Sequence, residues 1–117
     1  MQNYKDLLVW KKAHQLTLEI YKTVSTYPKE EIYSLVSQLK RASSSIATNI
    51  AEGTGRFSQK DLAHFLQIAL GSSHEVEYLL LLSKDLGFIN NELYIQLEKN
   101  INEIKAMLIS LIKKVRL

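Results

Sequence analysis

Hydrophobic residues recur every three or four positions along four segments of this chain, which is the spacing of one face of an α-helix. The pattern is clearest in the last segment and is repeated in the three before it. The repeating positions are, in chain order, Val9, Ala13, Leu16, Ile20 and Val24, widened by Trp10 and Tyr21; Ile32, Leu35, Leu39, Ala42, Ile46 and Ile50; Leu62, Phe65, Ala69, Ser72, Val76, Leu79 and Leu86; and Leu93, Leu97, Ile101, Ile104, Leu108, Leu111 and Val115. Alternation with a period of two is absent, so no strand is predicted.

Turn-forming residues separate these segments at Tyr27-Pro28-Lys29, at Gly53-Thr54-Gly55 and at Gly87 to Asn91. They predict helices over about 7–26, 31–53, 58–86 and 93–115. Ser58 is expected to cap the third helix with Asp61 reaching back to it, and Gly87 is expected to end that helix in a left-handed conformation. Four such helices with short connections predict an all-α fold, an antiparallel up-down-up-down four-helix bundle formed by one domain over residues 1–117.

The second predicted helix carries polar residues where a purely packing helix would be apolar. At about 100° per residue, Arg41, Ser45, Thr48 and Glu52 fall on one face, which Arg56 extends, with Asn49 beside them. The third helix has a similar break at residues 71–75, where small residues precede Glu75. A pairing of Arg41 with Glu52 or Glu75 would satisfy charges that are costly to bury alone.

Three interpretations of this polar stripe remain open from the residues alone. The stripe could fix the register of the helices inside one subunit, or it could lie at an interface between subunits. It could also contact RNA directly through Lys40, Arg41 and Arg56, although the carboxylates of Glu52 and Glu75 would repel phosphates. The residues assigned to a polar network or to assembly are Arg41, Asn49, Glu52 and Glu75.

The charge of the chain is mildly basic, with a net charge of +3. Residues 1–60 hold nine Lys and Arg against five Asp and Glu, whereas residues 61–117 hold six against seven. This distribution is compatible with nucleic-acid binding but is short of a strongly basic stripe, and solvated helix faces alone are the more common explanation of such a distribution. The candidate nucleic-acid contacts are Lys11, Lys12, Lys40, Arg41 and Arg56.

No pattern of residues predicts catalysis or a cofactor. The chain has no cysteine, and an acidic residue stands three places before a histidine only once, at Asp61 and His64, so neither a thiolate site nor a di-metal bundle site is expected. The serines lack a glycine-flanked nucleophile turn. Residues 53–56 follow a helix and lack the Lys-hydroxyl pair of a phosphate loop. A non-enzymatic protein without cofactor or metal is therefore predicted.

The aromatic residues allow two interpretations. Their rings could stack on nucleobases, but at helical spacing they are more typical of core caps and interface anchors. These residues are Tyr4, Trp10, Tyr21, Tyr27, Tyr33 and Tyr78.

Several motifs resemble a known bacterial family in their order and spacing. They are Leu8-Val9-Trp10-Lys11-Lys12-Ala13, residues 27–35, residues 38–46, Asn49-Ile50-Ala51-Glu52-Gly53 and Ala69-Leu70-Gly71-Ser72-Ser73-His74-Glu75. The chain is identified from them as a member of the 23S rRNA intervening-sequence protein family, also called ribosomal-protein-like, with a match from about Tyr4 to Lys114.

This resemblance implies a cytoplasmic four-helix bundle that assembles as a homopentameric ring. The chain is also distantly similar to the accessory proteins of diversity-generating retroelements, which bind nucleic acid and a reverse transcriptase. RNA or DNA, a partner protein and further copies of the chain are therefore the expected partners. A membrane is not expected, because the longest apolar run, residues 78–82, is too short to span one.

Overall fold

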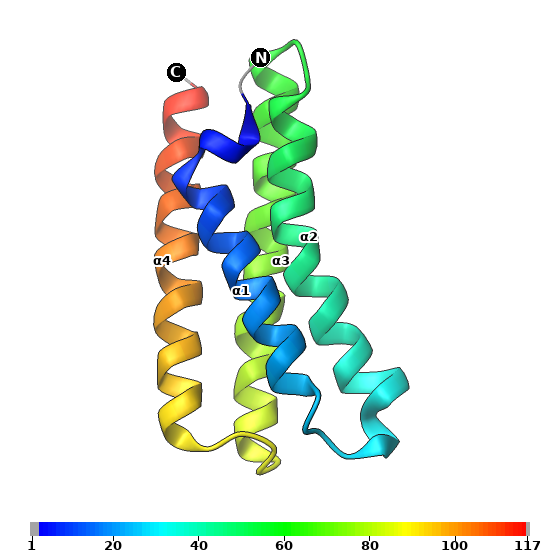
Figure 1. The fold of residues 1–117 in the computed structure, drawn as a ribbon. Coiled ribbons are helices and arrows are strands. Elements are labelled where there is room, and N and C mark those ends of the chain that lie inside the picture. Colours follow the sequence, from blue (N-terminus) through cyan, green and yellow to red (C-terminus); the bar gives the residue numbers. More distant parts are fainter. Residues whose placement is uncertain (1–2, 117) are drawn as a thin grey trace.

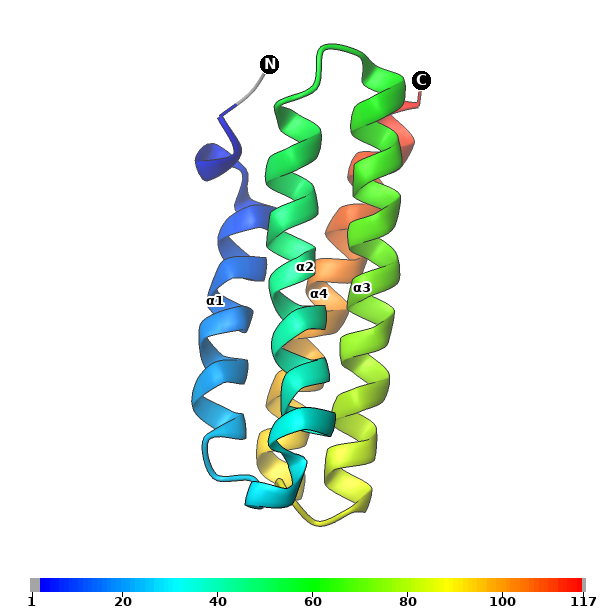
Figure 2. The ribbon, with the colours of Figure 1, turned by 90° about the vertical axis from the view of Figure 1, so that its right-hand side faces the viewer.

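The computed structural model describes residues 3–116, and residues 1, 2 and 117 of the predicted domain lie outside the described part. Four long helices form an antiparallel up-down-up-down bundle of 43 × 24 × 20 Å, as predicted (Figures 1 and 2). The helices are α1 (Leu8–Val24), α2 (Ser37–Thr54), α3 (Gln59–Asp85) and α4 (Asn91–Val115). Short helical turns precede α1 and α2: η1 (Tyr4–Asp6), η2 (Lys29–Glu31) and η3 (Ile32–Val36). Residues 3–116 contain no strand.

The predicted apolar stripes form the core, since most of their members are buried. Three positions were wrong: Tyr21 is 46% exposed, Ile32 is 48% exposed and Leu86 is 52% exposed. Ile32 and Leu86 lie where the chain leaves its helix at the end of the bundle, and there no neighbouring helix covers them. Conversely, Leu66 and Leu80 are fully buried although the stripe of the third segment omitted them. Because α3 packs against both α2 and α4, it buries a wider face than a single stripe.

The helix ends follow the turn chemistry of the sequence. The Ser58 hydroxyl accepts a hydrogen bond of 3.0 Å from the Asp61 amide, as expected of a cap, although no reciprocal bond from Asp61 is found among the described residues. Gly87 has a φ of +81°, which confirms the left-handed residue after α3. The second helix differs from its predicted range of 31–53, because residues 29–36 form the turns η2 and η3 before the regular α-helix begins at Ser37.

Membrane insertion is not favoured by any helix within residues 3–116, since each is too short or too polar to cross a bilayer.

Candidate nucleic-acid interface and polar face

Part of the polar stripe links α2 to α3 within the subunit. The hydroxyl groups of Ser45 and Ser72 lie 2.9 Å apart, and the Asn49 amide donates to the Ser45 carbonyl at 2.8 Å and to its hydroxyl at 2.9 Å. These side chains are partly buried between the two helices. Asn49 thus bonds within α2 to Ser45, and the Ser45–Ser72 contact is the part of the stripe that joins α2 to α3 inside the subunit.

The predicted pairing of Arg41 with Glu52 or Glu75 is wrong within the subunit. Glu52 instead accepts a hydrogen bond of 3.1 Å from Arg56, one turn further along. Arg41 and Glu52 share a helix face, but eleven residues separate them by about 16 Å along the axis, which is beyond side-chain reach. Arg41 and Glu75 are both exposed, and no ion pair joins either of them to another residue of the described chain.

The exposed side of α3 next to this stripe contains Gly71. A Cβ atom built at Gly71 would have nothing within 4 Å, so no contact inside the subunit requires a glycine there. Glu75 lies one turn away on the same exposed side. We call Arg41 of α2 together with Gly71 and Glu75 of α3 the outer face; all three residues are exposed.

The five predicted nucleic-acid contacts do not form one cluster. Lys12 pairs with Glu103 of α4 at 3.1 Å, and Lys40 lies over the ring of Tyr21 at 4.9 Å. Arg56 lies over the ring of Phe65 at 4.8 Å while it pairs with Glu52. Lys11 and Arg41 are exposed but belong to opposite halves of the bundle.

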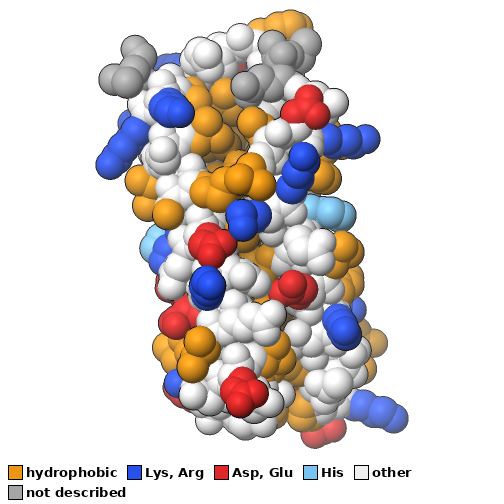
Figure 3. Space-filling model, turned by 60° about the vertical axis from the view of Figure 1, so that its left-hand side comes forward, with side chains coloured by type: hydrophobic (Ala, Val, Ile, Leu, Met, Phe, Trp, Pro, Cys, Tyr) orange, Lys and Arg blue, Asp and Glu red, His pale blue; other side chains and the backbone are white. Residues whose placement is uncertain are grey.

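Charge is instead divided along the long axis of the bundle. We call residues 3–16, 46–71 and 104–116 the basic end; it carries both described termini and the α2–α3 turn (Figure 1). It holds nine Lys and Arg against three Asp and Glu, whereas the acidic end, residues 17–45 and 72–103, holds six against nine. On the face in Figure 3, most Asp and Glu side chains accordingly lie in the middle and lower parts.

Besides Lys11, which was among the five predicted contacts, the basic end has five further exposed and unpaired cations that were not predicted. Six of its basic side chains are exposed and form no ion pair with a described carboxylate. They are Lys5, Lys11, Lys60, Lys113, Lys114 and Arg116. The signal that could have identified them was the predicted up-down topology, which brings the start of the first helix beside the end of the last.

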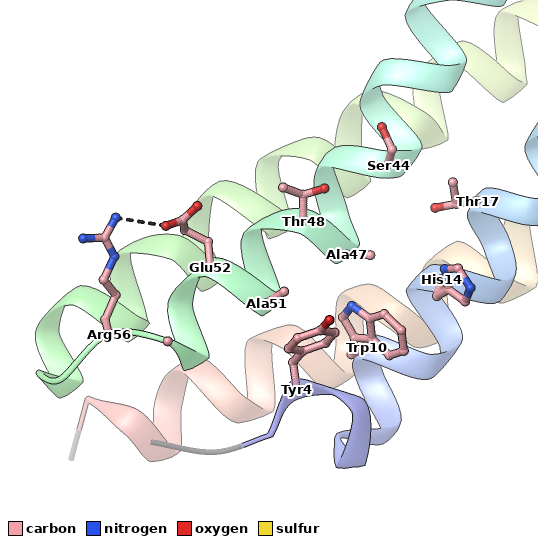
Figure 4. Close-up of a pocket in the computed structure, with 11 residues that line it drawn as sticks. Tyr4, Trp10, His14, Thr17, Ser44, Ala47, Thr48, Ala51, Glu52 and Arg56 are labelled. Atoms are coloured by element: carbon pink, nitrogen blue, oxygen red, sulfur yellow. Dashed lines mark hydrogen bonds and ion pairs between the residues drawn. The ribbon is translucent and has the colours of Figure 1, made fainter.

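A groove between α1 and α2 opens near the basic end and has a volume of about 770 Å³ (Figure 4). One wall is aromatic: Tyr4 meets Trp10 edge to face at 4.9 Å, and Trp10 stacks parallel to His14 at 5.0 Å. The α2 side presents only small side chains, and Glu52 and Arg56 lie at one end of the groove. The small residues are Ser44, Ala47, Thr48 and Ala51.

Burial raises the pKa of two tyrosines outside this groove, Tyr27 and Tyr94. The Tyr27 hydroxyl is buried without a hydrogen-bond partner. The nearby Ser83 hydroxyl lowers the pKa of Tyr27 and so offsets part of the effect of burial. The Ser83 hydroxyl donates its hydrogen bond to the Leu79 carbonyl at 2.8 Å, however, and no hydrogen bond joins the hydroxyls of Ser83 and Tyr27. Within residues 3–116, no group of three His, Asp or Glu side chains is placed to hold a metal ion.

Comparison with known proteins agrees with this architecture. The model of a family described as 23S rRNA-intervening sequence protein matches residues 5–110. A solved structure of a protein with unknown function, from the S23 ribosomal protein family of Bacteroides thetaiotaomicron, is similar at 30% identity with a TM-score of 0.82. The alignment covers 91% of this chain and 99% of that one. A search of curated proteins found no match.

Proposed function

The chain belongs to the 23S rRNA-intervening sequence protein family, and we propose that it is a non-enzymatic protein that assembles with copies of itself and binds RNA at its basic end. The division of charge along the bundle carries this proposal. The described residues hold neither a metal-ligand cluster nor the nucleophile and phosphate-loop patterns that an enzymatic role would use. Of the predicted contacts, Lys11, Lys12 and Arg56 belong to the basic end, where Lys12 is paired with Glu103, whereas Lys40 and Arg41 belong to the acidic end.

The basic end suits a polyanion because its cations are available. The six exposed, unpaired side chains need not release a carboxylate before they contact a phosphate. Each contact to a phosphate releases condensed counterions, which favours binding and makes it depend on salt. The acidic end would repel the same strand, so the division of charge also orients the protein on RNA.

Assembly is supported by the outer face. A glycine inside a helix costs about 1 kcal/mol relative to alanine, yet Gly71 has no neighbour in the subunit that would exclude a methyl group. The close approach of another copy would explain the glycine, and Arg41 and Glu75 would then pair across the contact. The family resemblance suggests a cytoplasmic homopentamer as the form of this assembly.

The proposal is tested by measuring the affinity for a structured RNA at several salt concentrations. We expect Lys60→Glu, Lys113→Glu and Lys114→Glu together to weaken binding strongly and to reduce the slope of log K against log salt by roughly two to three. The matched control is Lys22→Glu, Lys29→Glu and Lys99→Glu, which makes the same charge change with exposed lysines of the acidic end. Equal weakening by both triple variants, or no binding by the unmodified protein at low salt, would contradict the proposal.

A protein-interaction adaptor without a nucleic-acid role is the second candidate. It is favoured by the exposed aromatic side chains of Tyr33 and Phe57, which are 96% and 94% exposed. An apolar cleft between α1 and α4, near the basic end, favours it as well, and apolar side chains gather in that part of Figure 3. The cleft is lined in part by Leu7, Leu8, Met107 and Leu111. Exposed aromatic and apolar groups of this kind are typical of protein interfaces.

A further inference from the structure

We propose that the groove between α1 and α2 stacks an unpaired nucleobase of the RNA strand whose phosphates contact the basic end. This inference rests on the proposed function, which it deepens by assigning the kind of RNA and the place where a base binds. The groove lies at the right position for this, because Tyr4, Trp10 and Arg56, which line it, all belong to the basic end.

The aromatic wall provides the surface for stacking. Trp10 and His14 lie parallel, with 6° between their planes, so they form one continuous stack along the groove. His14 is exposed and Trp10 is partly exposed, which leaves ring surface open to a ligand. Tyr4 packs against Trp10 from the η1 turn and extends the wall toward the basic end (Figure 4). Base–aromatic stacking of this kind tolerates any base, because every base has a π-face.

The opposite side of the groove leaves room for the base. Between Ser44 and Ala51, α2 contributes no side chain larger than threonine to the groove. The volume of about 770 Å³ falls in the range of pockets that hold small organic ligands. A flat heterocycle can therefore enter between the aromatic wall of α1 and the small residues of α2, whereas a base paired in a duplex cannot leave its stack to do so without losing its partner.

The charges around the groove fit a neutral base with a phosphate outside. Glu52 is neutralised by Arg56, and both side chains are about half-exposed, so the pair contributes little stability and Arg56 can exchange its carboxylate for a phosphate at small cost. Lys5 lies 5.9 Å from the ring of Tyr4, and Lys11 directly follows Trp10 in the chain. The two charged side chains Glu52 and Arg56 that line the groove thus offset each other, and Lys5 lies beside its aromatic wall.

Trp10 is the single tryptophan of the chain, so its fluorescence reports on this groove alone. We expect a single-stranded RNA hexamer to quench this fluorescence to saturation, and a duplex of the same length to leave it nearly unchanged. A mononucleotide is tested separately. If it quenches the fluorescence of Trp10 as strongly as the hexamer does, the proposal that the groove binds a base of an RNA strand is overturned. Fluorescence that changes on dilution of the protein, but not with RNA, would show instead that a second copy occupies the groove.

Affinity measurements on variants complete the test. His14→Ala removes an exposed ring and should leave the fold intact, and Trp10→Leu removes the central ring. Each should weaken binding of the hexamer by roughly 5- to 100-fold, which corresponds to the loss of one stacked base. Tyr33→Ala, the matched control, removes an exposed aromatic ring at the acidic end and should have no effect. Thermal unfolding checks that Trp10→Leu still folds, and His14→Ala decides the question if it does not.

The outcomes separate this inference from the proposed function. If neither groove variant weakens binding while the basic-end triple variant does, the base-stacking inference is overturned and the RNA surface stands. If the unmodified protein binds neither hexamer nor structured RNA at low salt, both fail together.

Discussion

Gly71 allows the packing of the subunit to be tested separately from its assembly. It lies in the interior of the 27-residue helix α3, it is exposed, and a Cβ atom at this position would have no neighbour within 4 Å. Alanine is favoured over glycine inside a helix by about 1 kcal/mol. We therefore expect Gly71→Ala to raise the free energy of unfolding of the isolated subunit by about 0.5–1 kcal/mol, and its Tm by about 3–5 °C.

Gly53→Ala is the matched variant, with the same chemical change in a crowded place. Its Cβ would lie 3.0 Å from the Cβ of Phe65 and 3.1 Å from Cδ1 of Leu62. The leucine can rotate away, but the Phe65 Cβ is fixed to the backbone of α3, so the two helices must separate. Overpacking costs about 1–3 kcal/mol, which exceeds the gain in helix propensity. We expect a net loss of roughly 1 kcal/mol.

The assay is thermal unfolding followed by circular dichroism at several protein concentrations, together with the mass measured by light scattering. If another copy covers Gly71, Gly71→Ala should raise the stability of the dilute subunit and lower the mass of the assembly. A raised Tm with unchanged mass would contradict the place of Gly71 in the assembly. A dilute subunit destabilised by Gly71→Ala, or stabilised by Gly53→Ala, would refute the packing argument itself.

Two further variants test single interactions. Tyr27→Phe removes a buried hydroxyl that has no hydrogen-bond partner, so the free energy of unfolding at pH 7 should stay equal or rise by up to about 1 kcal/mol. Burial raises the pKa of Tyr27 above 10 in the folded protein, so the stability that its neutral form contributes is complete below pH 10 and is lost as the pH rises through the folded pKa. In urea unfolding, the free energy of unfolding of the variant should therefore increase relative to that of the unmodified protein above pH 10. A difference in stability that does not depend on pH would contradict this. Ser58→Ala removes the cap of α3 and should cost about 1 kcal/mol in the same urea assay, whereas Ser110→Ala, at an exposed position inside α4, should cost nothing.

The positions of the helices could be predicted from the sequence, because they depend on residues that are close together in the chain. Apolar residues every three or four positions, Ser58 before α3 and Gly87 after it each depend on neighbours within a few residues. The errors begin at positions whose burial depends on which other helix packs against them. Ile32 and Leu86 continue an apolar pattern beyond the point at which another helix can cover them, and Leu66 and Leu80 are buried only because α3 has neighbours on two sides.

The candidate site was less predictable, because its parts are distant in the chain. Arg41 and Glu52 share one face of α2, but their distance along the helix axis keeps them from pairing, and Glu52 pairs with Arg56 instead. Charges counted over the N-terminal and C-terminal halves of the sequence do not reveal that basic and acidic residues lie at opposite ends of the bundle. Lys5 and Arg116 belong to opposite ends of the sequence and to the same end of the fold. The groove likewise needs α1 and α2 side by side before Trp10 faces Ala47.

The positions of the two proposed surfaces determine how they would act together. The outer face lies on the flank of α2 and α3, whereas the unpaired cations of the basic end lie near the two described termini and the α2–α3 turn, so contacts between copies through the flank would leave those cations free. In a ring whose rotation axis is parallel to the bundle axes, all copies point in one direction. Their basic ends would then form a single rim, and each would add its cations and its groove to the same RNA strand. In such an arrangement the modest positive charge of one subunit is sufficient for tight binding of RNA by the assembly, because linked sites raise the affinity far above that of one site. For the same reason, if Gly71→Ala dissociates the assembly, it should weaken the binding of a long RNA while leaving that of a hexamer unchanged.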